Sequence, residues 1–429
     1  MSLINYSKSF FLLCKKNRYL ILLWLLFTSS EPFQFYAIIP NHPYKILIFF
    51  ITTLFLFKLI QKKYNFKFDV FNIIILIQIL FSILTIPIHY LSLREFAFED
   101  GVIYFNLILQ LIVILITYLF VKNYLNFIVI TKSYILVLLS MVILGTIGVV
   151  LIYSVNLQPF SYTIREGNRD ISNFIFTFAT GKFEDNFLTI IRSSGYFDEP
   201  GTFAFYIVIA ILLNKLYGFS KKIEYALMIL GFCTLSLAFI ISVFLYIIIF
   251  AFIEKRFIFL TILLGSIITI FSFIYLMKDE DPVYQQLYEL TIYRFQNDGT
   301  NSEQKFNGDN RSENITYAFK AFIEAPFFGY GMNAHVNPKT DYYGKICCNP
   351  LHPLATEGIF GTILYFLMFF YWFFVIFKNQ KLDYISFACW FIIFINLIQR
   401  PGFSNGPFGY FVYILLIKGT LWRKEKIYN

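Results

Sequence analysis

The chain has 429 residues, of which 58% are hydrophobic and only 14% are charged, and its formal net charge is +9. Soluble domains carry about 25% charged residues, so 56 phenylalanines and a mean hydropathy of +0.66 exclude a soluble globular protein. Apolar runs near the ~20 residues that cross a bilayer recur from Tyr19 to Trp422. The composition therefore predicts an all-α fold, a polytopic bundle of membrane helices.

The predicted spans follow one another along the whole chain. They are residues 19–39, 44–60, 70–90, 102–121, 134–153, 201–217, 225–253, 257–277, 354–377, 384–399 and 409–422. Lys15, Lys16 and Arg18 precede the first span, and no small-residue cleavage site follows it. By the positive-inside rule we expect a retained signal anchor with a cytoplasmic N-terminus.

The run of residues 225–253 is too long for one upright crossing, because a single helix of this length would measure ~43 Å. One crossing would also leave the basic segments 254–256 and 423–426 outside the cell. Two short crossings that turn near residues 236–238 return both segments to the cytoplasm. The sequence thus predicts about twelve transmembrane helices with both termini in the cytoplasm.

The charges can be sorted by this topology. Most of the 35 Lys and Arg residues fall on the cytoplasmic side, whereas the outer loops are net acidic. A pI near 9 would by itself suggest a nucleic-acid partner. Since the basic excess follows the orientation in the membrane instead, we expect no nucleic-acid partner.

Two connections are long, residues 154–200 and 278–353, and both fall on the extracytoplasmic face of the predicted topology. Loops of this length are functional or disordered as a rule, and their aromatic residues, Gly-Pro punctuation and helical patterning favour order. We expect both loops to be partly helical. They would belong to one integral membrane domain that takes in residues 1–429.

The clearest predicted helix of the second loop begins after residue 310. Asn310 and Glu313 have the spacing of a capping box. An apolar stripe follows with helical periodicity, namely Ile315, Ala318, Phe319 and Phe322. Arg311 lies one turn before this stripe, so we expect it on the same inward face. Two interpretations would account for a positive charge on the inward face: a salt bridge from Arg311 to Glu199 or Glu357, or the binding of an anion by Arg311.

Arginines gather on the predicted extracytoplasmic face. The six are Arg165, Arg169, Arg192, Arg294, Arg311 and Arg400. Each alone is explained by a solvated charge, and Arg192 with Glu199 also fits an interfacial ion pair at the helix that Pro200 opens. Guanidinium groups bind phosphate and diphosphate oxygens through paired hydrogen bonds without losing their charge. The collection therefore indicates an anion-binding site at the mouth of the bundle.

His352 lies at the start of the tenth span in the twelve-crossing topology, with Glu357 a little over one turn later. Histidine titrates near neutral pH, so His352 is a candidate general base; a structural histidine at the membrane surface is the alternative. Cys347 and Cys348 with His335 match no zinc-site spacing. We expect no metal, and a free vicinal pair of cysteines.

Three short segments carry a resemblance to a known family. Residues 192–201 bring Glu199-Pro200 into a span, Arg311 precedes a helix that ends in Ala325-Pro-Phe-Phe-Gly-Tyr-Gly331, and His352 is followed by Glu357-Gly358-Ile-Phe-Gly361. Together with the arrangement of spans and long loops, these segments resemble the superfamily of Wzy-type O-antigen polymerases and O-antigen ligases.

The resemblance implies glycosyl transfer in lipopolysaccharide biosynthesis. The donor would be an undecaprenyl-diphosphate-linked oligosaccharide at the periplasmic face of the bacterial inner membrane. Arg192 and Arg311 would bind the diphosphate, with help from Arg165, Arg169, Arg294 or Arg400. An acceptor hydroxyl would attack the anomeric carbon, assisted by His352 or Glu199, and a single displacement would invert that carbon. No metal, nucleotide or other cofactor is required.

The acceptor distinguishes two versions of this chemistry. A polymerase, which residues 198–201 favour, transfers the glycan to another lipid-linked O-antigen or capsule repeat unit, whereas a ligase transfers it to the lipid A core. A chain-length regulator is left open as a further partner. A flippase or other transporter is the rival from another class, but it predicts charged residues inside the spans and short loops on both sides. The interiors of the spans are almost free of Asp, Glu, Lys and Arg, and two of the outer loops are long.

Overall fold

The computed structural model describes residues 50, 52–57, 59–60, 69–92, 98–124, 126–155, 161–163, 171–173, 179–183, 190–195, 197, 200–280, 284–285, 287–288, 292–293, 311–332, 334, 341–346, 349–378, 383–399 and 407–428. The predicted first span lies outside these residues. Of the candidate site, so do Arg165, Arg169, Glu199, Arg294 and Arg400.

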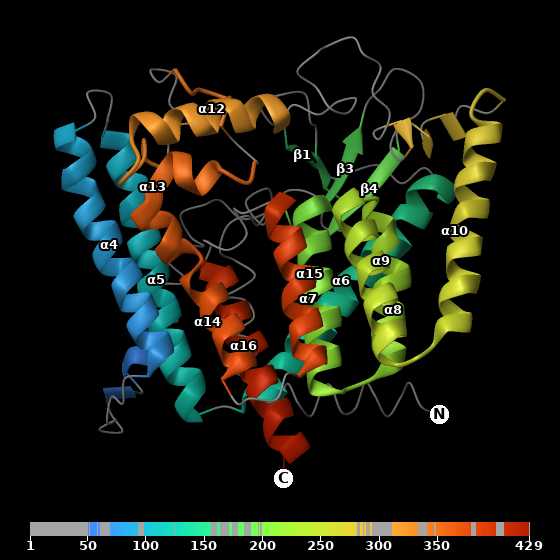
Figure 1. Ribbon diagram of the computed structural model, residues 1–429, viewed down its shortest axis with the longest axis horizontal. Helices are drawn as coiled ribbons and strands as arrows, with labels where there is room; N and C mark the ends of the chain where they lie inside the picture. The colour runs from blue at the N-terminus through green and yellow to red at the C-terminus, as the bar shows by residue number, and fades with distance from the viewer. Residues whose placement is uncertain are drawn as a thin grey trace.

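Helices make up most of the described chain and lie side by side, which confirms the predicted bundle (Figure 1). They are α4 (Val70–Ser92), α5 (Phe98–Tyr124), α6 (Phe127–Val155), α7 (Pro200–Tyr217), α8 (Lys221–Gly231), α9 (Leu237–Ile253), α10 (Phe257–Met277), α12 (Arg311–Glu324), α13 (His352–Tyr365), α14 (Leu367–Phe377), α15 (Tyr384–Gln399) and α16 (Pro407–Tyr428). Of these, α12 lies crosswise over one end of the bundle.

Several helices are long and apolar enough to cross a membrane. Five such stretches occur among the described residues: Val70–Leu91, Gly101–Asn123, Phe127–Val155, Pro200–Tyr217 and His352–Phe377. Three shorter apolar helices add to them, Leu237–Ile253, Ile268–Met277 and Tyr384–Ile398. These helices confirm a polytopic membrane protein, while the number of twelve crossings stays a prediction.

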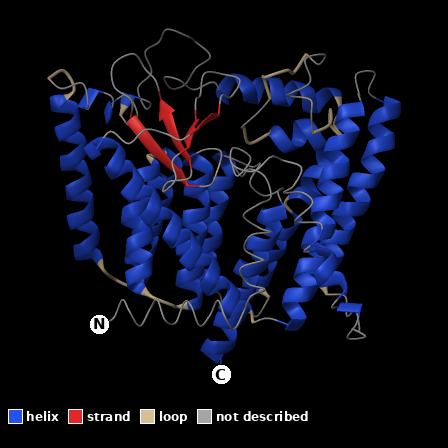
Figure 2. Ribbon diagram, turned by 180° about the vertical axis from the view of Figure 1, so that it is seen from behind, coloured by secondary structure: helices blue, strands red, loops and turns tan. Residues whose placement is uncertain are grey.

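The first long loop contains strands that the sequence analysis did not predict. Strands β1 (Ser161–Thr163), β2 (Ile171–Asn173), β3 (Ala179–Phe183) and β4 (Ile190–Gly195) form an antiparallel sheet in the order β1-β2-β3-β4. Their β-branched and aromatic residues favour strands, but runs of three to six residues are too short to show a clear alternation. Figure 2 shows the sheet at one end of the helices, which we call the sheet end; α16 ends at the opposite, tail end.

Helix α7 is the centre of the bundle. Its apolar span is 94% buried, and it packs against α6, α8, α9, α15 and α16. Aliphatic and aromatic residues occupy every face of α7, and a helix that is apolar all round suits either the core of a protein or a membrane span. Because α7 starts five residues after β4, the innermost helix begins directly at the sheet.

Strand β4 approaches the bundle closely because a glycine makes room for it. A Cβ on Gly145 of α6 would overlap the side chain of Ser193, which is 2% exposed. At the end of β4, Gly195 has a φ of +56° and lies against the ring of Phe203 on α7. The sheet is therefore seated on α6 and α7 rather than held away from them.

The long run of residues 225–253 is broken, as the sequence predicted. Between α8 and α9, the short 3-10 helix η2 (Phe232–Thr234) is followed by Leu235 in the left-handed region, at a φ of +44°. The Thr234 hydroxyl donates to the carbonyl of Gly231 and accepts from the N–H of Ser236. This turn lies at the sheet end, next to β4.

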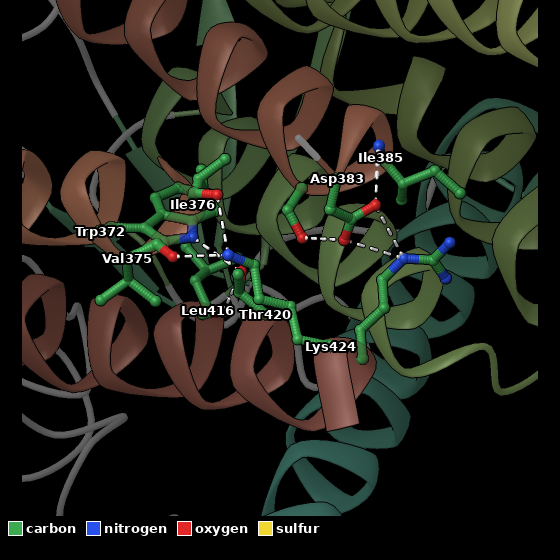
Figure 3. A network of polar contacts seen from close by, with 10 residues as sticks. Trp372, Val375, Ile376, Asp383, Ile385, Leu416, Thr420 and Lys424 are labelled. Carbon is green, nitrogen blue, oxygen red and sulfur yellow. Dashed lines mark hydrogen bonds and ion pairs between the residues drawn. The ribbon is translucent and has the colours of Figure 1, made fainter. Parts of the chain in front are cut away.

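At the tail end, α16 ties two other helices together (Figure 3). Lys424 is 4% exposed, and its Nζ donates to the carbonyls of Val375 and Ile376, 2.8 Å from each, in the last turn of α14. Cations are favourable at helix C-termini, where carbonyls lack intrahelical partners. On the preceding residue, Arg423, Nε lies 3.1 Å from the carboxylate of Asp383, which comes directly before α15.

We expect Lys424→Met to destabilise the protein, because the last carbonyls of α14 would lose their donor while remaining buried. The loss in stability should be ~1–3 kcal/mol, seen as a lower midpoint of thermal unfolding in detergent. Glu425→Gln, at the exposed neighbouring position, is the matched control and should leave the midpoint unchanged. Equal midpoints for the two variants would mean that the lysine does not stabilise this joint.

Candidate functional site

The second long loop is joined to α13 by backbone hydrogen bonds. Helix α13 is kinked at Gly358, where φ is +64° and ψ is −166°, and residues 326–331 lie across the kink. Four hydrogen bonds join them, from Tyr330 N to Ala355 O, Gly331 N to Thr356 O, Ile359 N to Pro326 O and Phe360 N to Phe327 O, at 2.9, 2.8, 2.8 and 3.3 Å. We call this arrangement the interlock.

Two glycines allow the backbones of the interlock to touch. A Cβ on Gly358 would overlap the carbonyl carbon of Phe327 and lie 2.5 Å from the nitrogen of Phe328. A Cβ on Gly329, whose φ is +65°, would lie 2.6 Å from the nitrogen of Glu357. The Gly-Tyr-Gly and Glu-Gly motifs noted in the sequence are therefore two halves of one contact.

A buried histidine holds the interlock against α4 and α5. His89 is fully buried, and since a carbonyl can only accept, its Nε2 donates to the carbonyl of Phe328 at 2.8 Å. Nδ1 is then the accepting nitrogen, and the hydroxyl of Tyr104 lies 3.4 Å from it. The same hydroxyl accepts from the N–H of Met332 at 3.2 Å. Two membrane helices thus fix both ends of the Gly-Tyr-Gly turn.

His352 is the first residue of α13, and its tautomer follows from its surroundings. Nδ1 lies 2.8 Å from the carbonyl oxygen of Ile346, which must be the acceptor, so Nδ1 carries the proton. The neutral ring therefore has its basic lone pair on Nε2. This is the arrangement that a general base requires, because Nδ1 fixes the orientation of the ring while Nε2 can accept a proton.

Asn349 shapes the turn that holds His352, a role that the sequence analysis missed. It is fully buried; its Oδ1 accepts from the N–H of Leu351 at 2.8 Å, and its Nδ2 donates to the carbonyl of Ile346 at 2.9 Å. That carbonyl is also the one that receives Nδ1 of His352. The available signal was Asn349-Pro350, a pair typical of turn initiation.

Glu357 lies one residue before the kink and is 3% exposed. A Cβ on Gly361 would lie 2.9 Å from Glu357 Oε2 and 3.1 Å from the ring of Phe81 on α4. The carboxylate therefore lies against Gly361, on the side of α13 that faces Phe81 of α4, where a larger side chain at position 361 would displace it. Its predicted pairing with Arg311 stays a prediction, since the structure describes the backbone of Arg311 but not its side chain.

Arg192 lies on β4 and is 9% exposed. Its Nε donates to the carbonyl of Thr234 in η2 at 3.0 Å. This bond uses one of the five N–H donors of the guanidinium group, and it holds the side chain in a fixed position between the sheet and the turn that joins α8 to α9. An arginine that was predicted to bind an anion therefore also has a structural contact.

Arg311 begins α12, at the end of this helix away from α4. The C-terminal end of α12 leads directly to Phe328, which contacts His89 of α4. The helix therefore runs across the sheet end, from above the middle of the bundle to the end of α4 (Figure 1). Helix α12 also packs on α13. The elements that begin with Arg311 and His352 are thus direct neighbours.

The sequence analysis predicted the inward face of α12 only in part correctly. Ile315 and Phe319 are 36% and 53% exposed, whereas the inner face consists of Asn314, Ala318 and Ala321. These alanines pack with Ala355 and Ile346 of the neighbouring segments. The helix lies close to α13, and only small side chains fit between them, so the large apolar residues are turned aside.

A carboxylate braces the outer side of the interlock. Oε2 of Glu324, at the end of α12, accepts from the hydroxyls of Tyr330 and Tyr342 at 2.8 and 2.5 Å. Hydrogen bonds from Tyr342 and then Tyr330 lower the pKa of Glu324, while burial and the hydrogen bond to Glu324 raise the pKa of Tyr342. The brace is therefore strongest while Glu324 is ionised, and it weakens as the carboxylate becomes protonated in acid.

The two comparisons with known proteins differ in what they find. Residues 225–366 match a family model described as O-antigen ligase, a segment that runs from α8 through the interlock and His352. This confirms the resemblance to the Wzy-type polymerase and O-antigen ligase superfamily. No curated protein matches the sequence.

The O-antigen ligase family segment contains three of the predicted site residues and excludes the others. Arg294, Arg311 and His352 lie inside it, whereas Arg192, the remaining arginines and Glu199 lie outside it. Among the described residues, no three His, Cys, Asp or Glu side chains gather as a metal site would require. Cys347 and Cys348 lie outside the described part of the chain.

We expect Gly358→Ala to disrupt the site, because a side chain there would both strain the backbone and separate the two halves of the interlock. The backbone strain alone should cost ~1–3 kcal/mol. Gly344→Ala is the control, since Gly344 also has a positive φ, +70°, but nothing lies within 4 Å of its added Cβ. Thermal unfolding in detergent should show a much lower midpoint for Gly358→Ala. Similar midpoints would mean that the close contact is not needed.

Proposed function

We propose that the protein is an inner-membrane glycosyltransferase that polymerises polyprenyl-diphosphate-linked O-antigen or capsule repeat units at the periplasmic face. The observation that carries this proposal is the match of residues 225–366, which include His352, to the O-antigen ligase family. A histidine with a basic Nε2 lies at the start of a kinked membrane helix, inside the segment that matches the O-antigen ligase family.

The distribution of charge supports the orientation. Lys122, Lys215 and Arg423 lie at the tail end, where each pairs with a carboxylate. Basic residues near the ends of spans mark the cytoplasmic side. The tail end would then face the cytoplasm, and the sheet end, with Arg192, Arg311 and His352, would face the periplasm.

The transfer is a single displacement at the anomeric carbon of the donor sugar. Nε2 of His352 takes the proton of an acceptor hydroxyl while the hydroxyl oxygen forms a bond to the anomeric carbon. Glu199 is the alternative base. The bond to the diphosphate oxygen breaks, and the lipid diphosphate leaves with the electron pair. Arg192 and Arg311, helped by Arg165, Arg169, Arg294 or Arg400, neutralise the departing charge. The anomeric carbon is inverted, and the step needs no metal or nucleotide.

A second candidate is an O-antigen ligase, which the description of the matching family favours. Its chemistry at the donor is the same, and the acceptor is the lipid A core in place of another lipid-linked repeat unit. Residues 198–201 support the polymerase by their resemblance to polymerase sequences. The two functions differ only in what the acceptor site holds.

We expect His352→Asn to fold but to lose turnover, because the amide can still donate to the Ile346 carbonyl but has no basic nitrogen. Loss of a general base should lower kcat by ~10²–10⁴-fold with little change in binding of the lipid-linked donor. The assay uses purified protein and lipid-linked oligosaccharide, with the unfolding midpoint as the control for folding. Turnover equal to that of the unchanged protein would exclude His352 as the base.

Deletion of the gene should separate the two acceptors on a lipopolysaccharide gel. Loss of a polymerase leaves lipid A core that carries one repeat unit, because ligation continues without chain growth. Loss of a ligase leaves bare core and polymer retained on the lipid carrier. If the lipopolysaccharide ladder and every other surface glycan stayed unchanged, both functions would be wrong.

A further inference from the structure

Helix α12 has an apolar edge that no other described part of the chain covers. Ile315, Phe319, Ile323 and the following Phe327 are 36%, 53%, 60% and 60% exposed. Ile315, Phe319 and Ile323 succeed one another at intervals of four residues, so they form one edge along the length of the helix. Four large apolar side chains in a row are more than the single exposed residues that soluble surfaces carry.

The rest of α12 is divided in the same orderly way. Asn314, Ala318 and Ala321 face α13 and are buried. Lys320 and Glu324 are exposed and lie on a separate strip of the helix surface, about 100–140° around the axis from the centre of the apolar edge. The helix therefore has one side that packs on α13, a second that carries exposed charged residues, and a third that is apolar and exposed.

The end of α12 lies at the depth of the membrane spans. Phe328, four residues after the helix, is bonded through its carbonyl to His89 and stacks on Phe81 with ring centroids 6.4 Å apart. Both partners belong to the apolar span Val70–Leu91. Helix α12 lies level with the end of α4 in Figure 1. The chain thus enters the membrane zone immediately after α12 ends.

The apolar edge continues into the surface of a membrane span. The ring of Phe327 stacks on that of Phe360 with centroids 5.9 Å apart. Ile359, Phe360 and Ile363 of α13 are 41%, 47% and 55% exposed within the span His352–Phe377. A membrane span presents such side chains to lipid, so the same medium reaches Phe327 and then the edge of α12.

We propose that α12 is an interfacial helix whose apolar edge, Ile315, Phe319, Ile323 and Phe327, is immersed in the outer leaflet of the bilayer. The occupant is bilayer lipid, because the edge is continuous with a lipid-facing surface and lies beside a span. An amphipathic helix in the plane of the membrane typically buries its apolar face at the boundary between headgroups and acyl chains. Lys320 and Glu324 then lie on the water side.

This position gives α12 a role in presenting the substrate. Helix α12 begins at Arg311, so an immersed helix keeps that residue near the level of the lipid headgroups. The diphosphate of a membrane-anchored donor lies at the same level, and the arginine need not reach out of the protein to meet it. This consequence rests on the proposed function, whereas the contact with lipid does not.

The test places a tryptophan at Phe319 or at its neighbour Lys320, in the full chain in nanodiscs of phosphatidylcholine. The lipid is either unlabelled or brominated on the acyl chains near the headgroup, and bromine quenches tryptophan on contact. The emission of the native tryptophans is subtracted using the unchanged protein. We expect the added emission of Phe319→Trp to be blue-shifted and mostly lost in brominated lipid, and that of Lys320→Trp to be retained.

Ile323→Trp extends the test along the same edge and should behave as Phe319→Trp does. All three positions are exposed, so the substitutions leave the core intact, and unfolding midpoints check this. Equal quenching at positions 319 and 320 would overturn the proposal. So would an unquenched Phe319→Trp, which is the result expected if a second copy or another protein covers the edge. A loss of transferase activity would not alter the quenching.

Discussion

The structure of the candidate site depends on one constraint, that backbone polar groups in a membrane must be satisfied within the protein. Helix α13 breaks at Gly358, inside a span that is apolar enough to cross the bilayer. The N–H and carbonyl groups on both sides of the break bond to residues 326–331 instead. Since both segments must approach to backbone contact, Gly329 and Gly358 cannot carry a side chain. The kink in α13 and the turn at residues 326–331 therefore depend on each other.

The interlock turns a loop into part of a rigid scaffold. His89 and Tyr104 attach it to α4 and α5, and Glu324 braces it from the outer side through two tyrosine hydroxyls. His352 begins the helix that the interlock holds, and the carbonyl of Ile346 sets its tautomer. If His352 acts as the proposed base, a ring held in this way would lose little freedom when a substrate binds, which is how preorganised sites lower the cost of reaction.

The two long loops are anchored in different ways. The first reaches the central helix through β4, where Gly145 makes room for the strand and Arg192 bonds to the turn between α8 and α9. The second is anchored by the interlock and by the alanine face of α12 on α13. Because both loops are seated on membrane helices, a site between them would be held at the surface of the bilayer, where a lipid-linked donor resides.

The sequence by itself determined the class of protein, most helix positions, the break near residue 236 and the family resemblance. These features depend on composition, on apolar run length and on local motifs, all of which act over a few helical turns. It did not determine the strands of the first loop, the covered face of α12, or the roles of His89 and Asn349. A strand of three residues is stable only beside its partners, and which face of a helix is covered depends on the space that its neighbour leaves. His89 lies 239 residues from Phe328, so only the tertiary structure could show that a histidine in one span supports a turn in a distant loop.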